Sequence, residues 1–441
     1  MKGVDYRSPI GRRFWIGLVA TAAVALVVRV TYIWFWRRGL PVGGDSRYYH
    51  EGANLLAQGK GFIEPFLYLD AGKTVQAADH PPLYIVYLAA FSLVGLTGAT
   101  AHLLASALVG VVTVVIVGLV GREVAGPRAG LIAAAIAALY PNLWAYDGAL
   151  ESETMAQLGV ALIMLAAYVW WRAPSRRSAA LLGGAVAFGA LARAELLLLA
   201  LILVVPLVVF RSGLVRRERV RQMFTAWVVA GLLIAPWCIY NLTRFEHPVL
   251  LSGGFEITLD SASCDDTYYG TSMGYWSVGC VERALQKSGL PDDTDRSVLA
   301  AMYRDDAVHY IRTHLSRLPV VILARVGRIT GLWHLQQQAT LDHIPAGREQ
   351  ELAWAAWYAY FALALLSIGG GILLRKRRVP VFPLLVFPAL VLFTTVTTFG
   401  QVRYRATAEV TLVVMAAIAI DAALGAYQSR RAHSSPVGAA P

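Results

Sequence analysis

The sequence predicts an all-α polytopic membrane protein with about ten transmembrane helices, in-plane juxtamembrane helices and a small extracytoplasmic segment. Of its 441 residues, 57% are hydrophobic and only 15% are charged, whereas soluble domains carry about 25% charged residues. Long apolar runs make up the difference, and the first of them covers residues 14–36. The bilayer is therefore the solvent for most of this chain.

The apolar run 14–36 follows a basic start and predicts an uncleaved first transmembrane helix. It is longer than a signal-peptide core, and no small-residue cleavage site follows it. The net charge of +11 comes from 39 Lys and Arg against 28 Asp and Glu. In a membrane protein such an excess belongs to cytoplasmic loops, so no nucleic-acid partner is expected.

Crossing the hydrocarbon core takes about 20 apolar residues, and ten segments approach that length. The predicted spans are residues 14–36, 101–121, 129–145, 152–171, 179–193, 195–211, 223–241, 351–374, 380–399 and 406–426. With ten spans, every basic cluster falls on the cytoplasmic side, as the positive-inside rule requires. These clusters are Arg12/Arg13, Arg122/Arg128, Arg172/Arg176/Arg177, residues 211–221, residues 375–378 and Arg430/Arg431.

Two further apolar segments, 82–96 and 318–335, are expected to lie in the outer interface, because counting either as a span would move later basic clusters outside. The second carries Arg325 and Arg328 at helical spacing. The stretch 178–210 is expected to form a hairpin of two short helices, with Arg193 and Glu195 at its outer turn.

The three cysteines differ in their expected surroundings. Cys238 lies inside a predicted span and is expected to be a small core residue. Cys264 and Cys280 lie 16 positions apart in an outer polar segment, where an oxidising exterior favours a disulfide. The alternative is two unpaired thiols, and the pattern does not resemble a zinc site.

The first outer segment opens with Gly-Gly-Asp-Ser-Arg-Tyr-Tyr-His-Glu at residues 43–51. A carboxylate at the membrane surface, such as Asp45, is a candidate general base for an acceptor hydroxyl. The alternative is that Asp45 caps a helix over residues 46–57 by accepting bonds from free N–H groups.

A second acidic group, Glu151 and Glu153, begins the fourth span on the outer side. Carboxylates at a membrane boundary cost a few kcal/mol unless they are paired or hydrated, so they indicate a polar cavity. The alternative is that they only complement the dipole of a helix N-terminus.

Outer arginines form the third group. Arg193 lies beside Glu195, and Arg403 and Arg405 flank Tyr404 before the last span. A guanidinium suits phosphate, because it is planar and always charged; snorkelling or pairing, such as Arg193 with Glu195, is the alternative. The topology places all three groups at one membrane face, as expected for an active site, whereas a transporter more often places its ionisable residues at mid-membrane.

Several short motifs together resemble the GT-C superfamily of glycosyltransferases, and most closely the branch containing bacterial protein O-mannosyltransferases and the lipid A aminoarabinose transferase. The motifs lie within residues 14–426. They are GGDSRYYHEGANLLAQGKGF after the first span, HPPLY at 80–84, LESETMAQL at 150–158, LARAELLLL around Arg193, PWCIYN at 236–241 and RYR at 403–405.

The resemblance implies a sugar donor on polyprenyl phosphate and a juxtamembrane active site without an evident cofactor; a divalent metal is left open. It implies that Asp45 is the catalytic base, and it favours Glu153 over Glu151 as the second acidic residue. It also implies that outer cations bind the donor phosphate. These candidates are Arg193, Arg403, Arg405 and Lys73, and the candidate substrate contacts are Tyr48, Tyr49, His50, His80, Glu195 and Tyr404.

The expected organisation has four parts. Residues 1–240 form an N-terminal catalytic transmembrane module with the first outer loop at 37–100, and residues 241–350 form the extracytoplasmic segment. Residues 351–428 form the C-terminal helices, and 429–441 a cytoplasmic tail.

The predicted function is inverting transfer of a sugar from polyprenyl phosphate to a hydroxyl acceptor, outside the inner (plasma) membrane. The acceptor is in doubt, because Ser46 follows Asp45 where the O-mannosyltransferase pattern has a second acid. The expected partners are the lipid-linked donor, membrane lipids and an unknown envelope glycan, lipid or protein. The alternatives are a transporter or lipid flippase, and a non-catalytic scaffold.

Overall fold

The structure, a computed structural model, describes residues 11–343 and 348–434. Long helices form a bundle, and shorter helices form the two outer segments. The bundle contains α1 (Arg12–Tyr32, extended by the π-helical turn η1, Ile33–Arg37), α5 (Ala99–Ala125), α6 (Pro127–Leu139), α7 (Pro141–Trp144), η2 (Ala145–Gly148), α8 (Glu153–Arg172), α9 (Arg176–Ala192), η3 (Ala194–Leu198), α10 (Leu199–Ile202), α11 (Val204–Val209), α12 (Arg216–Leu242), α19 (Gln350–Lys376), α20 (Phe382–Thr397), η4 (Val402–Arg405) and α21 (Ala406–Ser434).

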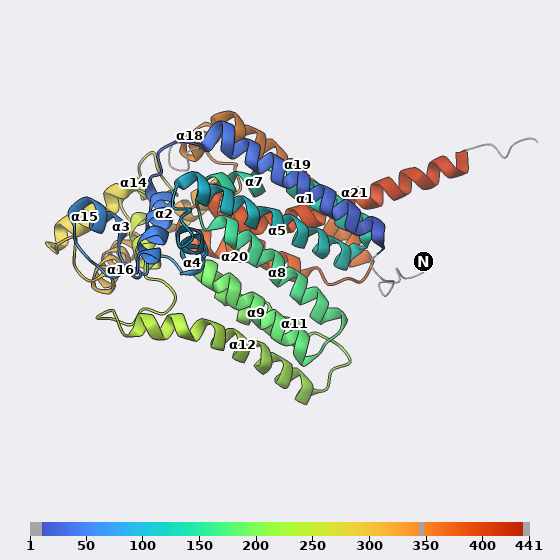
Figure 1. Cartoon of the computed structure of the whole chain (residues 1–441), viewed down its shortest axis with the longest axis horizontal. Coiled ribbons are helices and arrows are strands. Elements are labelled where there is room, and N and C mark those ends of the chain that lie inside the picture. Colours follow the sequence, from blue (N-terminus) through green and yellow to red (C-terminus); the bar gives the residue numbers. More distant parts are fainter. Residues whose placement is uncertain (1–10, 344–347, 435–441) are drawn as a thin grey trace, which may run out of the picture.

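The outer segments lie together at one end of this bundle. They contain α2 (Gly44–Ala57), α3 (Pro65–Ala71), α4 (Leu83–Ser92), α13 (Gly254–Ser261), α14 (Asp265–Tyr268), α15 (Val278–Ser288), α16 (Arg296–Thr313), α17 (Leu318–Ile329) and α18 (Leu335–His343). Figure 1 shows them on the left, whereas the start of α1 and the end of α21 lie at the right. Within the described ranges there is no strand, only an isolated bridge between Ile63 and Gln76.

The length and composition of the helices confirm an all-α polytopic membrane protein. Within the described residues, six helices are long and apolar enough to cross a membrane, or seven if the bent pair of α6 and the segment 141–148 is one span. The expected spans 179–193 and 380–399 correspond to α9 with 17 residues and α20 with 16. The expected span 195–211 is broken into η3, α10 and α11.

The two segments expected to lie in the interface form the short helices α4 and α17, and α17 buries two arginines. With 10 residues in α4 and 12 in α17, they are about 15 and 18 Å long, well below the roughly 30 Å of the hydrocarbon core. Arg325 and Arg328 on α17 are buried rather than directed toward headgroups. Arg325 donates to the carbonyl of Val396 on α20 at 2.8 Å and so fastens the outer segment to the bundle, whereas Arg328 donates to the carbonyl of Met273 within the outer segment at 2.6 Å.

Two breaks in the bundle helices place polar residues at the end of the bundle that α2 and the first outer loop cover. Pro141 cannot donate the next helical hydrogen bond, and the chain bends by 72° between α6 and the segment that follows. At Arg193 the backbone is extended, with φ −147° and ψ 122°, so α9 ends and the chain turns into η3. This break lies where the expected hairpin turns. Irregular backbone at membrane depth occurs where protein covers it or where it lines a cavity.

A buried ion pair fixes the segment after the first break. Arg29 on α1 donates to Asp147 on η2 at 2.5 Å, and both side chains are 1% exposed. Thr154 donates to the other carboxylate oxygen at 2.8 Å. Arg29 is therefore held inside the bundle by its acidic partner. A Cβ at Gly110 would lie 2.0 Å from the Asp147 carboxylate, so the pair requires glycine there.

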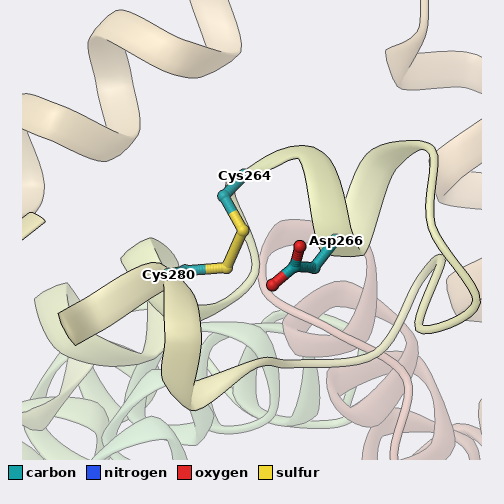
Figure 2. A group of neighbouring side chains, drawn as sticks. All are labelled: Cys264, Asp266 and Cys280. Carbon is teal, nitrogen blue, oxygen red and sulfur yellow. A yellow bond between two sulfur atoms is a disulfide. The ribbon is translucent and has the colours of Figure 1, made fainter. Parts of the chain in front are cut away.

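The expected disulfide between Cys264 and Cys280 is present. Figure 2 shows Asp266 beside it, and Arg283 donates to that carboxylate at 2.9 Å. Although these three residues have the spacing of a metal site, disulfide sulfurs are not thiolates and do not bind metal as thiolates do. Cys238 is half-buried at the edge of the bundle rather than in its core.

The first outer loop packs directly on the second outer segment. Lys73 forms an exposed ion pair with Asp292 at 2.8 Å, and Arg296 lies 3.4 Å from the buried carboxylate of Glu64. Of the expected tail 429–441, residues 429–434 continue α21, and 435–441 lie outside the described residues. The division of the chain at 240 and 350 stays a prediction.

Removing the disulfide is expected to destabilise the outer segment. Cys264→Ser with Cys280→Ser should cost about 3 kcal/mol in the chain-entropy model, and limited proteolysis within residues 254–313 should accelerate. Cys238→Ser is the control, because this cysteine lies outside the bond. Equal protease resistance of the unmodified protein, the double variant and Cys238→Ser would contradict the expectation.

Breaking the buried pair is expected to destabilise the bundle itself. Asp147→Ala leaves the Arg29 charge buried and alone, at a cost of about 3–5 kcal/mol, whereas Arg29→Met with Asp147→Leu should recover most of this. Glu218→Ala, which removes a half-exposed pair with Arg221, should cost about 1 kcal/mol or less. Thermal unfolding in detergent, followed by tryptophan fluorescence, measures all three.

Candidate active site

The site begins at the N-terminus of α2, where Asp45 lies in the first turn. The helix starts at Gly44 and its N-cap is Gly43, so Asp45 lies inside the first turn and not at the cap position. The capping interpretation of Asp45 is therefore wrong. Ser46 donates its hydroxyl to the carbonyl of Ala149, which holds this turn of α2 against the segment that precedes α8.

Arg403 on η4 joins three acidic residues from two distant segments. Its guanidinium donates to Asp45 Oδ2 at 2.6 Å, to Glu153 Oε1 at 2.6 Å and to Glu151 Oε1 at 3.3 Å. Glu151 and Glu153 are buried, and Asp45 is 38% exposed. Because each guanidinium N–H points in a fixed direction, one arginine orders all three carboxylates.

Arg193 adds a second guanidinium to the same cluster. It donates to Glu153 Oε1 at 2.5 Å and to Glu195 at 2.6 Å. Its guanidinium carbon lies 4.9 Å from the centre of the Tyr404 ring. The pairing of Arg193 with Glu195, which was the alternative to phosphate binding, is thus present, and Arg193 also contacts Glu153 of α8. Two arginines that are far apart in the sequence, Arg193 and Arg403, donate to the same oxygen of Glu153.

His80 approaches Asp45 from the first outer loop. Its Nε2 lies 3.8 Å from Asp45 Oδ1, the carboxylate oxygen that faces away from Arg403. The rings of Tyr48 and Tyr49 lie 5.0 and 4.8 Å from the His80 ring and hold it in place. Asp45 thus presents one oxygen to a cation and the other to a partly exposed space beside an imidazole.

The backbone beside the acidic residues is strained. Leu150, immediately before Glu151, adopts φ +52°, and a non-glycine residue in this region costs of the order of 1–3 kcal/mol. Its side chain is fully buried, which keeps it in this conformation. The strain aims Glu151 and Glu153 toward the same guanidinium across the start of α8.

The charges divide the acidic residues into two kinds. Burial alone would raise the pKa of Asp45, but the guanidinium of Arg403 outweighs this and lowers the pKa to about 2. Burial raises the pKa of Glu151 to about 8; Arg403 opposes this effect, while Glu153 and Asp45 reinforce it. Burial lowers the pKa of His80. At neutral pH, Asp45 is ionised, Glu151 carries a proton and His80 is neutral.

Three of the candidates lie away from this cluster. Lys73 pairs with Asp292 on the surface. Arg405 is buried, donates to Glu409 at 2.5 Å and stacks on Tyr360. His50 is within hydrogen-bonding distance of His102, with 2.9 Å between the two Nδ1 atoms.

Two residues near the cluster were not expected from the sequence. Arg348 is buried, donates to Asn142 at 3.1 Å, and lines a small cavity with Tyr32, Gln401 and Arg403. Tyr32 at the end of α1 donates to Glu349 at 2.8 Å. The sequence held one signal for Arg348. It is a basic residue just before the eighth expected span, on the side where the positive-inside rule makes arginine rare.

A family model described as dolichyl-phosphate-mannose-protein mannosyltransferase matches residues 79–240. This range contains His80, Glu151, Glu153, Arg193 and Glu195, whereas Asp45 and Arg403 lie outside it. A comparison with curated protein sequences finds no match.

Solved structures match along almost the whole chain. The archaeal oligosaccharyltransferase AglB from Archaeoglobus fulgidus, in complex with an inhibitory peptide and a dolichol-phosphate, is 18% identical with a TM-score of 0.58, over 98% of this chain and 52% of that chain. The same oligosaccharyltransferase tethered to an acceptor peptide is 17% identical with a TM-score of 0.56, over 97% and 52%. ArnT from Cupriavidus metallidurans bound to undecaprenyl phosphate is 16% identical, with a TM-score of 0.46, over 97% and 82%.

This chain spans about half the length of the archaeal enzyme, so the likeness concerns the fold. The expected resemblance to the GT-C superfamily is confirmed by the family match and by this fold. The chain is thus a polytopic membrane protein with the GT-C glycosyltransferase fold, and its residues 79–240 match the model of the dolichyl-phosphate-mannose-protein mannosyltransferase family.

Proposed function

We propose that this protein transfers a sugar from polyprenyl phosphate to a hydroxyl acceptor at the outer face of the plasma membrane. The observation that carries the proposal is the meeting of Asp45, Glu153, Arg193 and Arg403 in one partly exposed cluster. A carboxylate base beside guanidinium groups is what displacement of a phosphate leaving group requires.

The choice of donor is supported by the family description, which names a dolichyl-phosphate-linked sugar. It is also supported by the chemistry of the cluster. A leaving phosphate gains negative charge as its bond to the sugar breaks, and a fixed guanidinium stabilises that charge without reorganisation. Arg193 and Arg403 are the proposed phosphate ligands. Both side chains are mostly buried, and both guanidinium groups lie close enough to Asp45 to act on its charge.

The proposed reaction is a single displacement. The acceptor O–H proton passes to Asp45 Oδ1 as the acceptor oxygen bonds the anomeric carbon. The bond from that carbon to the phosphate oxygen breaks, and its electron pair leaves with polyprenyl phosphate. Attack opposite to the leaving group inverts the anomeric centre. The acceptor is a hydroxyl group of an envelope glycan, lipid or protein.

The ion pair of Asp45 explains how a weak base becomes stronger when donor binds. Held by Arg403, Asp45 has a low pKa and accepts a proton poorly. A donor phosphate competes for the same guanidinium. When Arg403 turns to the phosphate, Asp45 loses its main charge partner and its pKa rises toward the ordinary value. Binding of donor thus prepares the base.

Replacing the proposed base tests this mechanism. Asp45→Asn keeps the shape of the side chain but cannot accept the proton, so transfer of labelled sugar from membrane lipid should fall about 100- to 10,000-fold. Asp70→Asn is the matched control, because Asp70 lies on the same outer loop and forms an exposed pair with Arg47. It should stay within about twofold of the unmodified protein.

Thermal unfolding of both variants separates loss of chemistry from loss of fold. Full activity of Asp45→Asn would remove Asp45 from the mechanism. Absence of transfer from any lipid-linked sugar by the unmodified protein would instead favour the transporter or scaffold alternatives.

Glu151 is expected to set the dependence of donor binding on pH. Below its raised pKa of about 8 the side chain is neutral, and above it the new negative charge repels the donor phosphate. The KM for donor should therefore increase about tenfold as pH rises through this range, equivalent to about 1.4 kcal/mol of repulsion. In Glu151→Gln, which stays neutral, KM should not change with pH, and a similar pH dependence in this variant would contradict the assignment.

A further inference from the structure

Four polar side chains form a hydrogen-bonded network between α2, α4 and α5, away from the carboxylates that Arg403 joins. They are His50 and Asn54, one turn apart on α2, with Ser92 at the end of α4 and His102 near the start of α5. The two histidine Nδ1 atoms are 2.9 Å apart, His102 Nε2 lies 3.0 Å from Ser92 Oγ, and that oxygen lies 2.8 Å from Asn54 Oδ1. Both histidines are buried, so this histidine network has little contact with water.

The bonds of the histidine network can run in only one direction. Asn54 donates its Nδ2 to the carbonyl of Thr97 at 3.2 Å, so its Oδ1 faces Ser92 and accepts the hydroxyl hydrogen. Because a hydroxyl has one hydrogen, Ser92 must accept from Nε2–H of His102. A neutral imidazole carries one N–H, so Nδ1 of His102 is an acceptor and Nδ1 of His50 is its donor.

This direction limits how many protons the closed network can hold. Nε2 of His50 is the imidazole nitrogen left without a proton, and a proton added there keeps every bond. A second proton would have to enter at Nδ1 of His102, where it would set two N–H groups against each other at 2.9 Å. Two separated imidazoles in water take up two protons below about pH 6.5. Acid therefore favours the open state.

The charges around His50 leave this balance in place. Burial lowers the pKa of His50, and the carboxylate of Glu51 on the same helix acts in the opposite direction. His102 is the titratable group that faces His50 from α5. The other titratable side chains of α3 and α4 contact other groups: Tyr68 lies beside Lys60, Asp70 pairs with Arg47, Tyr84 contacts Ser106, and Tyr87 donates to Ala105. Protonation of His50 is therefore easier when the network is open.

The geometry of the two histidines fits a hydrogen bond better than a metal site. Two imidazole nitrogens on a tetrahedral zinc ion lie about 3.3 Å apart, since each bond is about 2.0 Å long. His50 Nδ1 and His102 Nδ1 are closer than this. Within the described residues, neither histidine belongs to a group of three side chains that could hold a metal ion.

The network holds the helix that carries Asp45. His50 lies five positions after Asp45, which at about 100° per residue places it about 140° around α2. Arg403 contacts Asp45 on one face at 2.6 Å, and His102 contacts His50 on another. Contacts on two faces keep α2 from turning about its axis. Once the network opens, α2 can turn and carry Asp45 away from Arg403.

We propose that the histidine network is a proton-sensitive latch on α2, which keeps Asp45 in place when closed and releases it in acid. The effect on transfer rests on the proposed function. The latch itself is a property of three packed helices and can be measured without any sugar. It makes the proposed enzyme dependent on the pH at the outer face of the membrane.

Hydrogen exchange of the α2 amides tests the latch in the intact protein in nanodiscs. After correction for the intrinsic exchange rate, protection of α2 should fall about tenfold per pH unit between about pH 6.5 and pH 5, because opening takes up one more proton. His102→Asn should stay protected throughout, since its amide oxygen takes the place of Nδ1 and accepts from His50 but does not titrate. His102→Ala should be poorly protected at every pH.

His309→Asn is the matched control, because His309 is an exposed histidine on α16, and it should behave as the unmodified protein does. Protection of α2 that does not depend on pH in the unmodified protein would overturn the latch. An equal loss of protection in acid by His102→Asn would overturn it too, because that variant retains every other histidine.

Transfer of labelled sugar gives the second readout and separates the two proposals. At about pH 5, His102→Asn should retain at least about threefold more of its neutral-pH activity than the unmodified protein. His80 is present in both proteins, so this difference belongs to the network. Opening in acid without any transfer at neutral pH would keep the latch and remove the enzyme. Transfer with α2 protection that is independent of pH would keep the enzyme and remove the latch.

Discussion

The guanidinium of Arg403 is the interaction on which the rest of the candidate site depends. Without it, Asp45, Glu151 and Glu153 would be three acidic groups close together in a poorly hydrated site, where like charges are unfavourable. With it, the start of α2, the turn before α8 and the start of α21 are joined at one point. The same contact that lowers the energy of the fold therefore assembles the groups that can do chemistry.

The broken helices determine where this point lies. A helix satisfies its own backbone in a membrane, and each break leaves polar groups that protein or water must satisfy. Arg193 lies at one break, and Asp147 and Glu151 follow another. The breaks occur at the outer end of the bundle, where α2 and the first outer loop cover them. The buried pair of Arg29 and Asp147 then prevents the second break from moving.

Sequence reasoning could place whole segments but not individual side chains. The positive-inside rule and the count of spans put Asp45, Glu153, Arg193 and Arg403 at one face, and the structure brings these four together. Sequence reasoning could not separate Arg403 from Arg405. Residues two apart on a 3₁₀-turn point in different directions, and only the surrounding fold decides which of them faces the site. Arg348 was missed, because its one signal, a basic residue on the side where positive charge is under-represented, comes with no motif or spacing that points to a site.

The charge balance of the cluster bears on how the proposed donor phosphate would bind. The phosphate must replace a carboxyl group as the partner of a guanidinium, because the cluster cannot take up its charge in addition. The guanidinium groups of Arg193 and Arg403 already contact Asp45, Glu151, Glu153 and Glu195, four carboxyl groups for two cations. A phosphate adds more negative charge, which a water-poor site tolerates only if some carboxyl group is neutral or turns away. The raised pKa of Glu151 supplies the neutral group. Asp45, whose side chain is 38% exposed, is the carboxyl group that can turn toward water. On this reasoning the two unequal acids are a condition for holding a phosphate here at all.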